Sequence, residues 1–381
     1  MDRTQRLLRS LTKGARIIEV GPSFSPLAPK RDGWNTFVVD HASREALRTK
    51  YADQDVSRIE EVDFVWQRGS IVDAVPDDQH GTFDAFIASH VIEHTPDIVT
   101  FLQAAQTLIK PDGIVILAAP DKRKCFDFYR HPSSTADAIE AFCQRRDRHS
   151  VRTHIDYALN MAHKPGGEGA WHGADTRPIS PVSSVSDEPN WRLAAGLPHY
   201  TDAHAWVFVP ASFQLMILEL AAAGYIDLRV EEVTEAEATE FYAWLRKGRE
   251  PLPQGDLQAK RKQLMDCIII ELAEQSRQIT ASPFNTAQSA EDAAARLAEA
   301  EFRVEAIQAV LEAARASTDR RGLNRRKFQG LIAEASRSIP STGPETVKHL
   351  VLLTEARRVL GLPHGLSGAA FEAREPKKQI A

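Results

Sequence analysis

Three residues near the start of the chain, Glu19, Gly21 and Asp40, have the types and spacing of a nucleotide-binding site. Glu19 lies in the apolar stretch RIIEV (16–20), and Gly21 follows it directly. A glycine at the carboxyl end of a buried strand allows a tight turn and a close backbone approach to a ligand. Asp40 ends the next apolar stretch, about 20 residues beyond Glu19, where a carboxylate can accept hydrogen bonds from ribose hydroxyls. Both a dinucleotide and S-adenosylmethionine (SAM) would fit these three residues.

The loop after Gly21 favours SAM. A dinucleotide fingerprint, G-x-G-x-x-G, places pyrophosphate on a helix N-terminus, but Ser23 and Pro26 stand at the later glycine positions here. Three prolines between residues 22 and 29 leave little room for a regular first helix. SAM carries no phosphate, and Glu19 could bind its ammonium group directly or through water. We therefore expect SAM, and not NAD, at this loop.

Alternating strand and helix patterns between residues 15 and 120 predict the sheet that positions these residues. Helical patterns at 43–52 and 97–109 separate apolar stretches, and such an order requires crossover connections. We predict an α/β fold with a doubly wound, mostly parallel, Rossmann-like sheet and an appended α-helical C-terminal region. The strands are expected at 16–20, 36–40, 62–66, 83–89 and 113–120.

The remainder of the chain is expected to complete this domain and to add helices. We predict a SAM-binding α/β domain over 1–250, with a loop and helical insertion at about 121–203, and a helical region over 251–381. The elements expected after the insertion are a strand at 204–210, a helix at 211–225, a strand at 226–233 and helices at 235–248 and 257–278.

A seven-residue apolar repeat marks the C-terminal region. Leu297, Val304 and Leu311 are seven positions apart, and Ala300, Ile307 and Ala314 follow them by three. The repeat fits a helix packed on its neighbour, and it also fits a coiled coil with a second copy or a partner. A homo-oligomer through these helices is therefore one of two interpretations.

Four ordered motifs carry a family resemblance. The stretches EVGPSFSP, VVDH, FDAFIASHVIEHTPD and LIKPDGIVILAAPD resemble the first, second, fourth and fifth motifs of class I SAM-dependent methyltransferases of the methyltransferase-11 type, with a G-P-S type first motif. The resemblance covers about residues 15–125 closely and extends more loosely to about 245. It implies SAM as the cofactor and methyl transfer (EC 2.1.1 type) as the activity.

The resemblance also implies roles for residues at matching positions. Glu19 and Gly21 would flank the methionine part of SAM, and Asp40, with His41 beside it, would hold the ribose. Ser70 and Ile71 would contact the adenine, and Ser89 and His90 would line the methionine side. Pro22 and Ser23 of the loop would lie close by.

Methyl transfer from a sulfonium needs alignment of the acceptor and, for a hydroxyl, a base that removes its proton. Candidate bases are His94, just past the fourth strand, His204 and His131. His90, Glu93 and His94 have a spacing that would suit zinc on a helix, but His90 is expected at a strand end, so no metal site is predicted.

Composition limits the remaining alternatives. Among 381 residues, 43% are hydrophobic and the net charge is −5, which is ordinary for a globular protein and gives nucleic-acid binding no support. The three cysteines form no CxxC pair, the N-terminal residues show no signal-like apolar region, and no apolar run approaches the length of a membrane span. A cytoplasmic location is expected.

The favoured interpretation is a SAM-dependent methyltransferase. The resemblance suggests an oxygen on a small-molecule or saccharide acceptor, in a setting such as glycan biosynthesis. The alternative is a catalytically inactive SAM-fold scaffold that acts through its helical tail. Intact Glu19, Gly21 and Asp40 argue against that alternative.

Overall fold

The structure is a computed structural model with two compact units, Met1–Ser282 and Pro283–Ala381. It describes residues 2–197, 199–236, 238–249, 252–280, 283–320, 322–340 and 345–362, without the side chains of 280 and 283–296. Each unit is presented by itself below.

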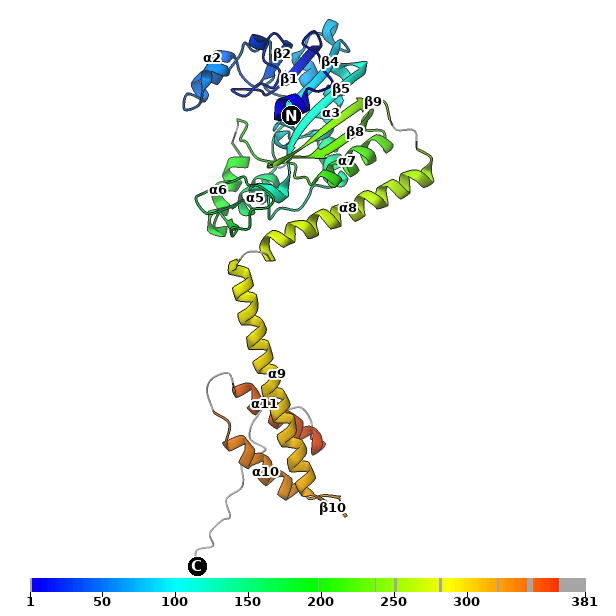
Figure 1. Cartoon of the computed structure of the whole chain (residues 1–381). Coiled ribbons are helices and arrows are strands. Elements are labelled where there is room, and N and C mark those ends of the chain that lie inside the picture. Colours follow the sequence, from blue (N-terminus) through cyan, green and yellow to red (C-terminus); the bar gives the residue numbers. More distant parts are fainter. Residues whose placement is uncertain are drawn as a thin grey trace, which may run out of the picture. The chain divides into compact units, whose positions relative to one another are not determined.

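A seven-stranded sheet in the order β3-β2-β1-β4-β5-β9-β8 forms the centre of the first unit (Figure 1). Strands β1 to β5 pair in parallel, whereas β9 pairs antiparallel with both β5 and β8. The predicted doubly wound, mostly parallel sheet is confirmed. The strands are β1 (Arg16–Val20), β2 (Asn35–Asp40), β3 (Phe64–Val65), β4 (Phe83–Ser89), β5 (Ile109–Pro120), β8 (Leu228–Glu235) and β9 (Glu240–Lys247).

Two predictions for the last third of the sheet are wrong. Residues 235–248 were expected to be helical, but β9 fills the slot between β5 and β8. Its side chains alternate between the two faces of the sheet, with Phe241 in one core cluster and Trp244 in the other. Burial on both faces outweighs the helix propensity of the stretch. Residues 204–210 are extended but pair only through a bridge from Phe208 to Asp121, and Pro210 begins the next helix.

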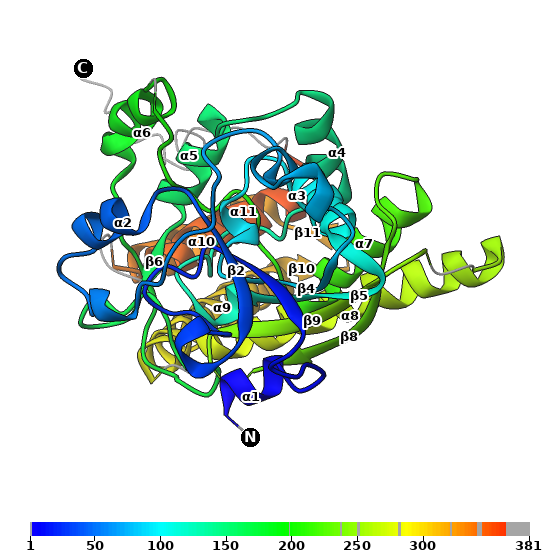
Figure 2. The ribbon, with the colours of Figure 1, turned by 90° about the horizontal axis from the view of Figure 1, so that it is seen from above.

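Helices cover the two faces of the sheet unequally. One face packs on α3, α4 and α7 through a large apolar cluster that includes Phe86, Leu102 and Phe213. The other face packs on α1 and on Leu27 and Ala28 of the loop after β1. Figure 2 shows the three helices on one side of the sheet and α1 on the other.

The helices of the first unit agree with the predicted positions at 43–52, 97–109, 211–225 and 257–278. A single turn, η1, stands in place of a first helix between β1 and β2, as the prolines predicted. The α-helices are α1 (Arg3–Leu7), α2 (Arg44–Lys50), α3 (Ile98–Leu108), α4 (Thr135–Cys143), α5 (Val151–Leu159), α6 (Glu188–Ala195), α7 (Pro210–Ala222) and α8 (Gln254–Thr280). The 3-10 turns are η1 (Lys30–Asp32), η2 (Val56–Arg58), η3 (Ile71–Ala74), η4 (Asp77–Gln79), η5 (Ile92–His94), η6 (Lys122–Lys124) and η7 (Val185–Asp187).

The insertion contains α4, α5 and α6 and a small ribbon of β6 (Ala162–His163) and β7 (Ser180–Pro181). Helix α8 packs on α7 and hydrogen-bonds the start of the insertion, where Gln275 donates to the carbonyl of Phe128 at 2.6 Å. The predicted domain boundary at residue 250 therefore falls before a helix whose contacts are with the first unit.

The second unit is a small helical bundle. Its elements are α9 (Pro283–Ser317), β10 (Thr318–Asp319), β11 (Gly322–Leu323), α10 (Arg325–Arg337) and α11 (Thr346–Val359). Helix α9 packs on α10 and α11 through Ala306 and Val310, while Leu297, Val304 and Leu311 are 63%, 54% and 62% exposed. Of the heptad residues, Ala314 packs against this core, whereas Leu297, Val304, Ile307 and Leu311 are exposed. No helix in the described part of the chain is long and apolar enough to cross a bilayer.

Candidate active site

A cavity of about 940 Å³ opens at the carboxyl ends of β1, β2 and β4 in the first unit. Strand β1 lies between β2 and β4 in the sheet. The chain continues from β1 to β2 and β3 on one side of β1, and then crosses to β4 on its other side. Ligands of open α/β sheets bind at such switch points. The cavity wall includes eight of the predicted site residues: Gly21, Ser23, Asp40, His41, Ser70, Ile71, His90 and His94.

Gly21 is required by its backbone conformation and by its neighbour. Its φ is +62°, which side-chain-bearing residues rarely adopt, and a Cβ atom there would lie 2.9 Å from Val91 Cγ2. Its N–H donates to the carbonyl of Val39 at 2.8 Å, so the turn after β1 is fixed to β2. Backbone atoms therefore form this part of the wall.

Asp40 connects the end of β2 to the proline-rich loop. Its Oδ2 accepts a hydrogen bond from the Ser23 N–H at 3.2 Å, and its Oδ1 accepts one from the His41 N–H at 2.7 Å. The carboxylate is almost fully buried yet lines the cavity. Oδ1 is also 2.7 Å from His41 Nδ1, so the second lone pair of Oδ2 is the one left to accept a hydrogen bond from a ligand hydroxyl.

Glu19 is held by backbone donors of the loop after β1. Its carboxylate accepts hydrogen bonds from the N–H groups of Leu27 at 2.6 Å and Ala28 at 3.2 Å, and it is 2% exposed. Burial raises the pKa of Glu19 to about 7, although these two hydrogen bonds oppose the shift. Glu19 and Pro22 are outside the set that lines the cavity, so this placement does not support a direct Glu19–ammonium contact.

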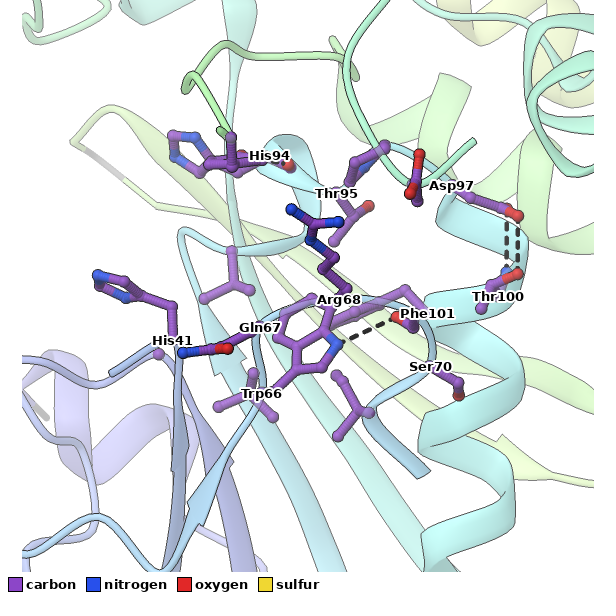
Figure 3. A pocket seen from close by; sticks show the side chains of 18 of the residues that line it. His41, Trp66, Gln67, Arg68, Ser70, His94, Thr95, Asp97, Thr100 and Phe101 are labelled. Carbon is purple, nitrogen blue, oxygen red and sulfur yellow. Dashed lines mark hydrogen bonds between the residues drawn. The ribbon is translucent and has the colours of Figure 1, made fainter. Parts of the chain in front are cut away.

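The loop after β3 supplies residues that the sequence did not indicate. Trp66, Gln67 and Arg68 line the cavity together with the predicted Ser70 and Ile71. Trp66 Nε1 donates to the carbonyl of Gly69 at 3.0 Å, which fixes the indole against the loop (Figure 3). An aromatic residue directly after a strand end was the signal that could have identified this wall.

His90 lies at the cavity wall, and its ring contacts Glu240, which is outside the set that lines the cavity. Its φ is +53°, and its Nε2 is 2.9 Å from Glu240 Oε2 on β9. Burial lowers the pKa of His90, but the hydrogen bond with Glu240 and the negative charge of nearby Glu93 outweigh burial and raise it to about 9. Ser89 is outside the set that lines the cavity, and its hydroxyl accepts a hydrogen bond from Arg3 at 2.7 Å.

The opposite side of the cavity contains His94, Tyr200 and Asp202. His94 Nδ1 is 2.8 Å from Asp202 Oδ1, and the Tyr200 hydroxyl donates to the same oxygen at 3.0 Å. Burial lowers the pKa of His94, but the bond to Asp202 outweighs burial and raises it. In Figure 3, Arg68 extends from the loop after β3 toward His94 and Thr95.

The other two predicted bases are placed differently from His94. His204 is buried behind the wall, with its ring centroid 4.5 Å from that of His94 and its Nδ1 2.6 Å from Asp127 Oδ2. His131 is exposed and is outside the set that lines the cavity. The structure therefore brings His94 and His204 together and leaves His131 apart.

The cavity has two walls. The cofactor side comprises Gly21, Ser23, Asp40, His41, Ser70 and Ile71. The histidine side comprises His94, Tyr200 and Asp202 at the wall, with Glu93, Asp127 and His204 behind it.

Comparisons with known proteins give one match to a family model. Residues 1–163 match the family model described as a methyltransferase domain. No protein with a curated function matches the sequence.

Solved structures give only distant likenesses. A Rhodobacter sphaeroides protein described as a zinc-dependent alcohol dehydrogenase is 15% identical, with a TM-score of 0.38 over 65% of this chain and 90% of that chain. A Mesorhizobium loti SAM-dependent methyltransferase is 14% identical, with a TM-score of 0.34 over 64% and 98%. The CcbJ methyltransferase of Streptomyces caelestis is 12% identical, with a TM-score of 0.34 over 64% and 94%. These values are too low to carry an argument about activity.

The family match over residues 1–163 describes a methyltransferase domain, and the sheet order and the cavity at its switch point agree with that class of protein.

Proposed function

We propose that this protein transfers the methyl group of SAM to an oxygen of a polar small-molecule or saccharide acceptor. The observation that carries the proposal is a single cavity with a ribose-competent carboxylate, Asp40, on one side and hydrogen-bonding groups of His94, Tyr200 and Asp202 on the other. Its volume of about 940 Å³ is near the upper end for small-molecule sites, which leaves room for an acceptor beside SAM.

The protein mainly has to align the acceptor oxygen with the methyl group of SAM. The acceptor oxygen attacks the methyl carbon in line with the breaking C–S bond, whose electron pair returns to sulfur and gives neutral S-adenosylhomocysteine. The hydroxyl proton must leave during or after this step. We place the acceptor against the histidine side, because His94 is the predicted base that reaches the cavity wall.

Binding measurements test the cofactor part of this proposal. Calorimetry should show one SAM and one S-adenosylhomocysteine per chain, and no heat with NAD. Binding of NAD without binding of SAM would overturn the proposal.

Product identification tests the acceptor part. Labelled methyl from SAM should enter a small polar product when the protein is added to a fractionated extract of its native cell. The matched control is Asp40→Ala, which should give little label at the same SAM concentration. Label that appears only in nucleic acid or only in protein would contradict the assigned acceptor class.

Three further expectations remain proposals: a cytoplasmic location, a homo-oligomer through the C-terminal helices, and Ser70 and Ile71 as adenine contacts. The exposed heptad face of α9 supports the second, and the position of both residues on the cavity wall supports the third.

A further inference from the structure

The carboxylate of Glu93 is buried without a hydrogen-bond donor. The residue is 1% exposed, and neither side-chain oxygen has a hydrogen-bond partner among the described residues. The nearest cationic groups are His90 Nδ1 at 3.4 Å and His94 Nε2 at 3.8 Å from Oε1, which are beyond ordinary hydrogen-bond lengths. A buried carboxylate in such surroundings is costly unless a cation compensates it.

Two imidazoles face this carboxylate with one nitrogen each already occupied. His94 Nδ1 is held by Asp202 at 2.8 Å, and His204 Nδ1 is held by Asp127 at 2.6 Å. A carboxylate at Nδ1 favours a proton on that nitrogen and leaves Nε2 with its lone pair free. Metal-binding histidines almost always show this arrangement, because the outer carboxylate orients the ring and makes its ligating nitrogen more basic.

Backbone contacts hold the three side chains together across more than a hundred residues of sequence. Glu93 and His94 lie in the tight turn η5, just after β4. The carbonyl of Glu93 accepts hydrogen bonds from Ala205 N–H at 2.7 Å and Trp206 N–H at 3.2 Å, which fixes His204 beside the turn. Trp206 Nε1 also donates to the carbonyl of Thr95 at 2.6 Å. The cluster is therefore built into the fold and not assembled from loose side chains.

We propose that Glu93, His94 and His204 form a binding site for a divalent transition-metal cation, with zinc the best match. Their ligand atoms all lie within 4.8 Å of one another. Ligands of a tetrahedral zinc at about 2.1 Å are roughly 3.4 Å apart, so the site needs only a small contraction. Two imidazoles and one carboxylate suit zinc or another borderline transition metal, whereas calcium and magnesium prefer an all-oxygen set.

Three protein ligands leave at least one coordination position open. His94 is part of the cavity wall, so an ion held by His94 would lie beside the place assigned to the acceptor. A metal there would polarise an acceptor hydroxyl and make its proton easier to lose. This consequence rests on the proposed function, and it replaces the role of His94 as a free base with that of a metal ligand. Metal binding itself does not depend on the proposed function.

Metal titration of the full chain tests the site. Protein freed of metal with a chelator should bind one Zn²⁺ per chain by calorimetry. Co²⁺ should give the visible absorption of a low-coordinate site, and that absorption should vanish when Zn²⁺ is added. Glu93→Gln and the double variant His94→Ala/His204→Ala should weaken Zn²⁺ binding by at least about 100-fold, and Asp202→Asn by about 10- to 100-fold through the outer carboxylate.

The matched control is His172→Ala, because His172 is an exposed histidine of the same unit outside the cavity wall. It should leave Zn²⁺ affinity unchanged. Circular dichroism and SAM calorimetry on each variant separate loss of a ligand from loss of the fold. If a variant fails to fold, the wild-type melting temperature with and without Zn²⁺ decides the question, because a site in the native state must raise it.

Two results would overturn the site: absence of stoichiometric Zn²⁺ or Co²⁺ binding by the wild-type chain, or binding that survives in Glu93→Gln and in the double-histidine variant. The first would indicate that protonated histidines compensate Glu93. Either result would leave SAM binding intact, so failure of the metal site is distinguishable from failure of the proposed function.

Discussion

The two walls of the cavity are built in different ways. On the cofactor side, residues follow consecutive strand ends, and the main contacts are hydrogen bonds from backbone N–H groups to Asp40 and to Glu19 behind it. On the histidine side, residues come from the turn after β4, from 127 and from 200–204, and the contacts are hydrogen bonds and ion pairs between side chains. The first wall follows from the sheet topology shared by the fold. The second depends on the packing of this chain's own insertion.

Removal of Asp127 should have the largest effect, because its carboxylate is 2% exposed and contacts both His204 and Arg130. We expect Asp127→Ala to lower the free energy of unfolding by about 3–5 kcal/mol, since it leaves a buried cation with an incomplete partner. Chemical denaturation measures the change, and the exposed Asp78→Ala is the control. A loss below about 1 kcal/mol would mean that the histidine side is not held by charge pairing.

Glu19 should give the cofactor side a pH-dependent stability. Because burial raises the folded-state pKa from 4.5 to about 7, the folded protein binds this proton more tightly than the unfolded chain does. The contribution is fully present below about pH 4.5 and declines as pH rises to about 7, by about 3 kcal/mol in total. Unfolding free energies of the wild type minus those of Glu19→Gln should fall across this window. A difference that is constant with pH would show that Glu19 titrates normally in the fold.

Removal of Asp40 should affect one wall only. We expect Asp40→Ala to weaken SAM binding by about 1.5–3 kcal/mol, the range for hydrogen bonds to a charged group. The same variant should retain the Zn²⁺ affinity of the histidine side, and Asp78→Ala should leave both affinities unchanged. Unchanged SAM affinity would remove Asp40 from the site, and a parallel loss of Zn²⁺ would mean that the two walls are not separable.

Deletion of 283–381 should have the smallest effect on the cavity, because the residues that line it all belong to the first unit. We expect SAM affinity within about twofold of the full chain and a change in oligomeric state, since the exposed Leu297, Val304 and Leu311 are lost. Calorimetry and light scattering measure the two quantities. A truncated chain that stays folded but no longer binds SAM would place the second unit in the active site.

The cofactor side was largely predictable because strand ends are local signals. Gly21 and Asp40 each end a short apolar run, and parallel strands bring such ends to one edge of the sheet. Glu19 was placed correctly on β1, but the direction of its carboxylate depends on Leu27 and Ala28, which fold back over the strand. No spacing of residues in the sequence indicates that this loop folds back over β1.

The histidine side was only partly predictable because its contacts are distant in sequence. His94 was indicated by its place after β4, but Asp127, Tyr200 and Asp202 were not singled out as its neighbours. The stretch 204–210 was expected to be a strand, and the structure uses it instead as an extended segment bonded to Glu93. That change of role is what brings His204 next to His94.

The sequence by itself determined the parallel sheet, the stiff loop in place of a first helix, and the strand ends that form the cofactor side. These follow from local patterns of apolar, glycine and proline residues, which act over a few positions. Only the tertiary structure decided that β9 is a strand, that Glu19 faces the loop and that Glu93, His94 and His204 converge. Each of these depends on which buried groups pack together across long sequence separations, where burial and charge compensation outweigh local preference.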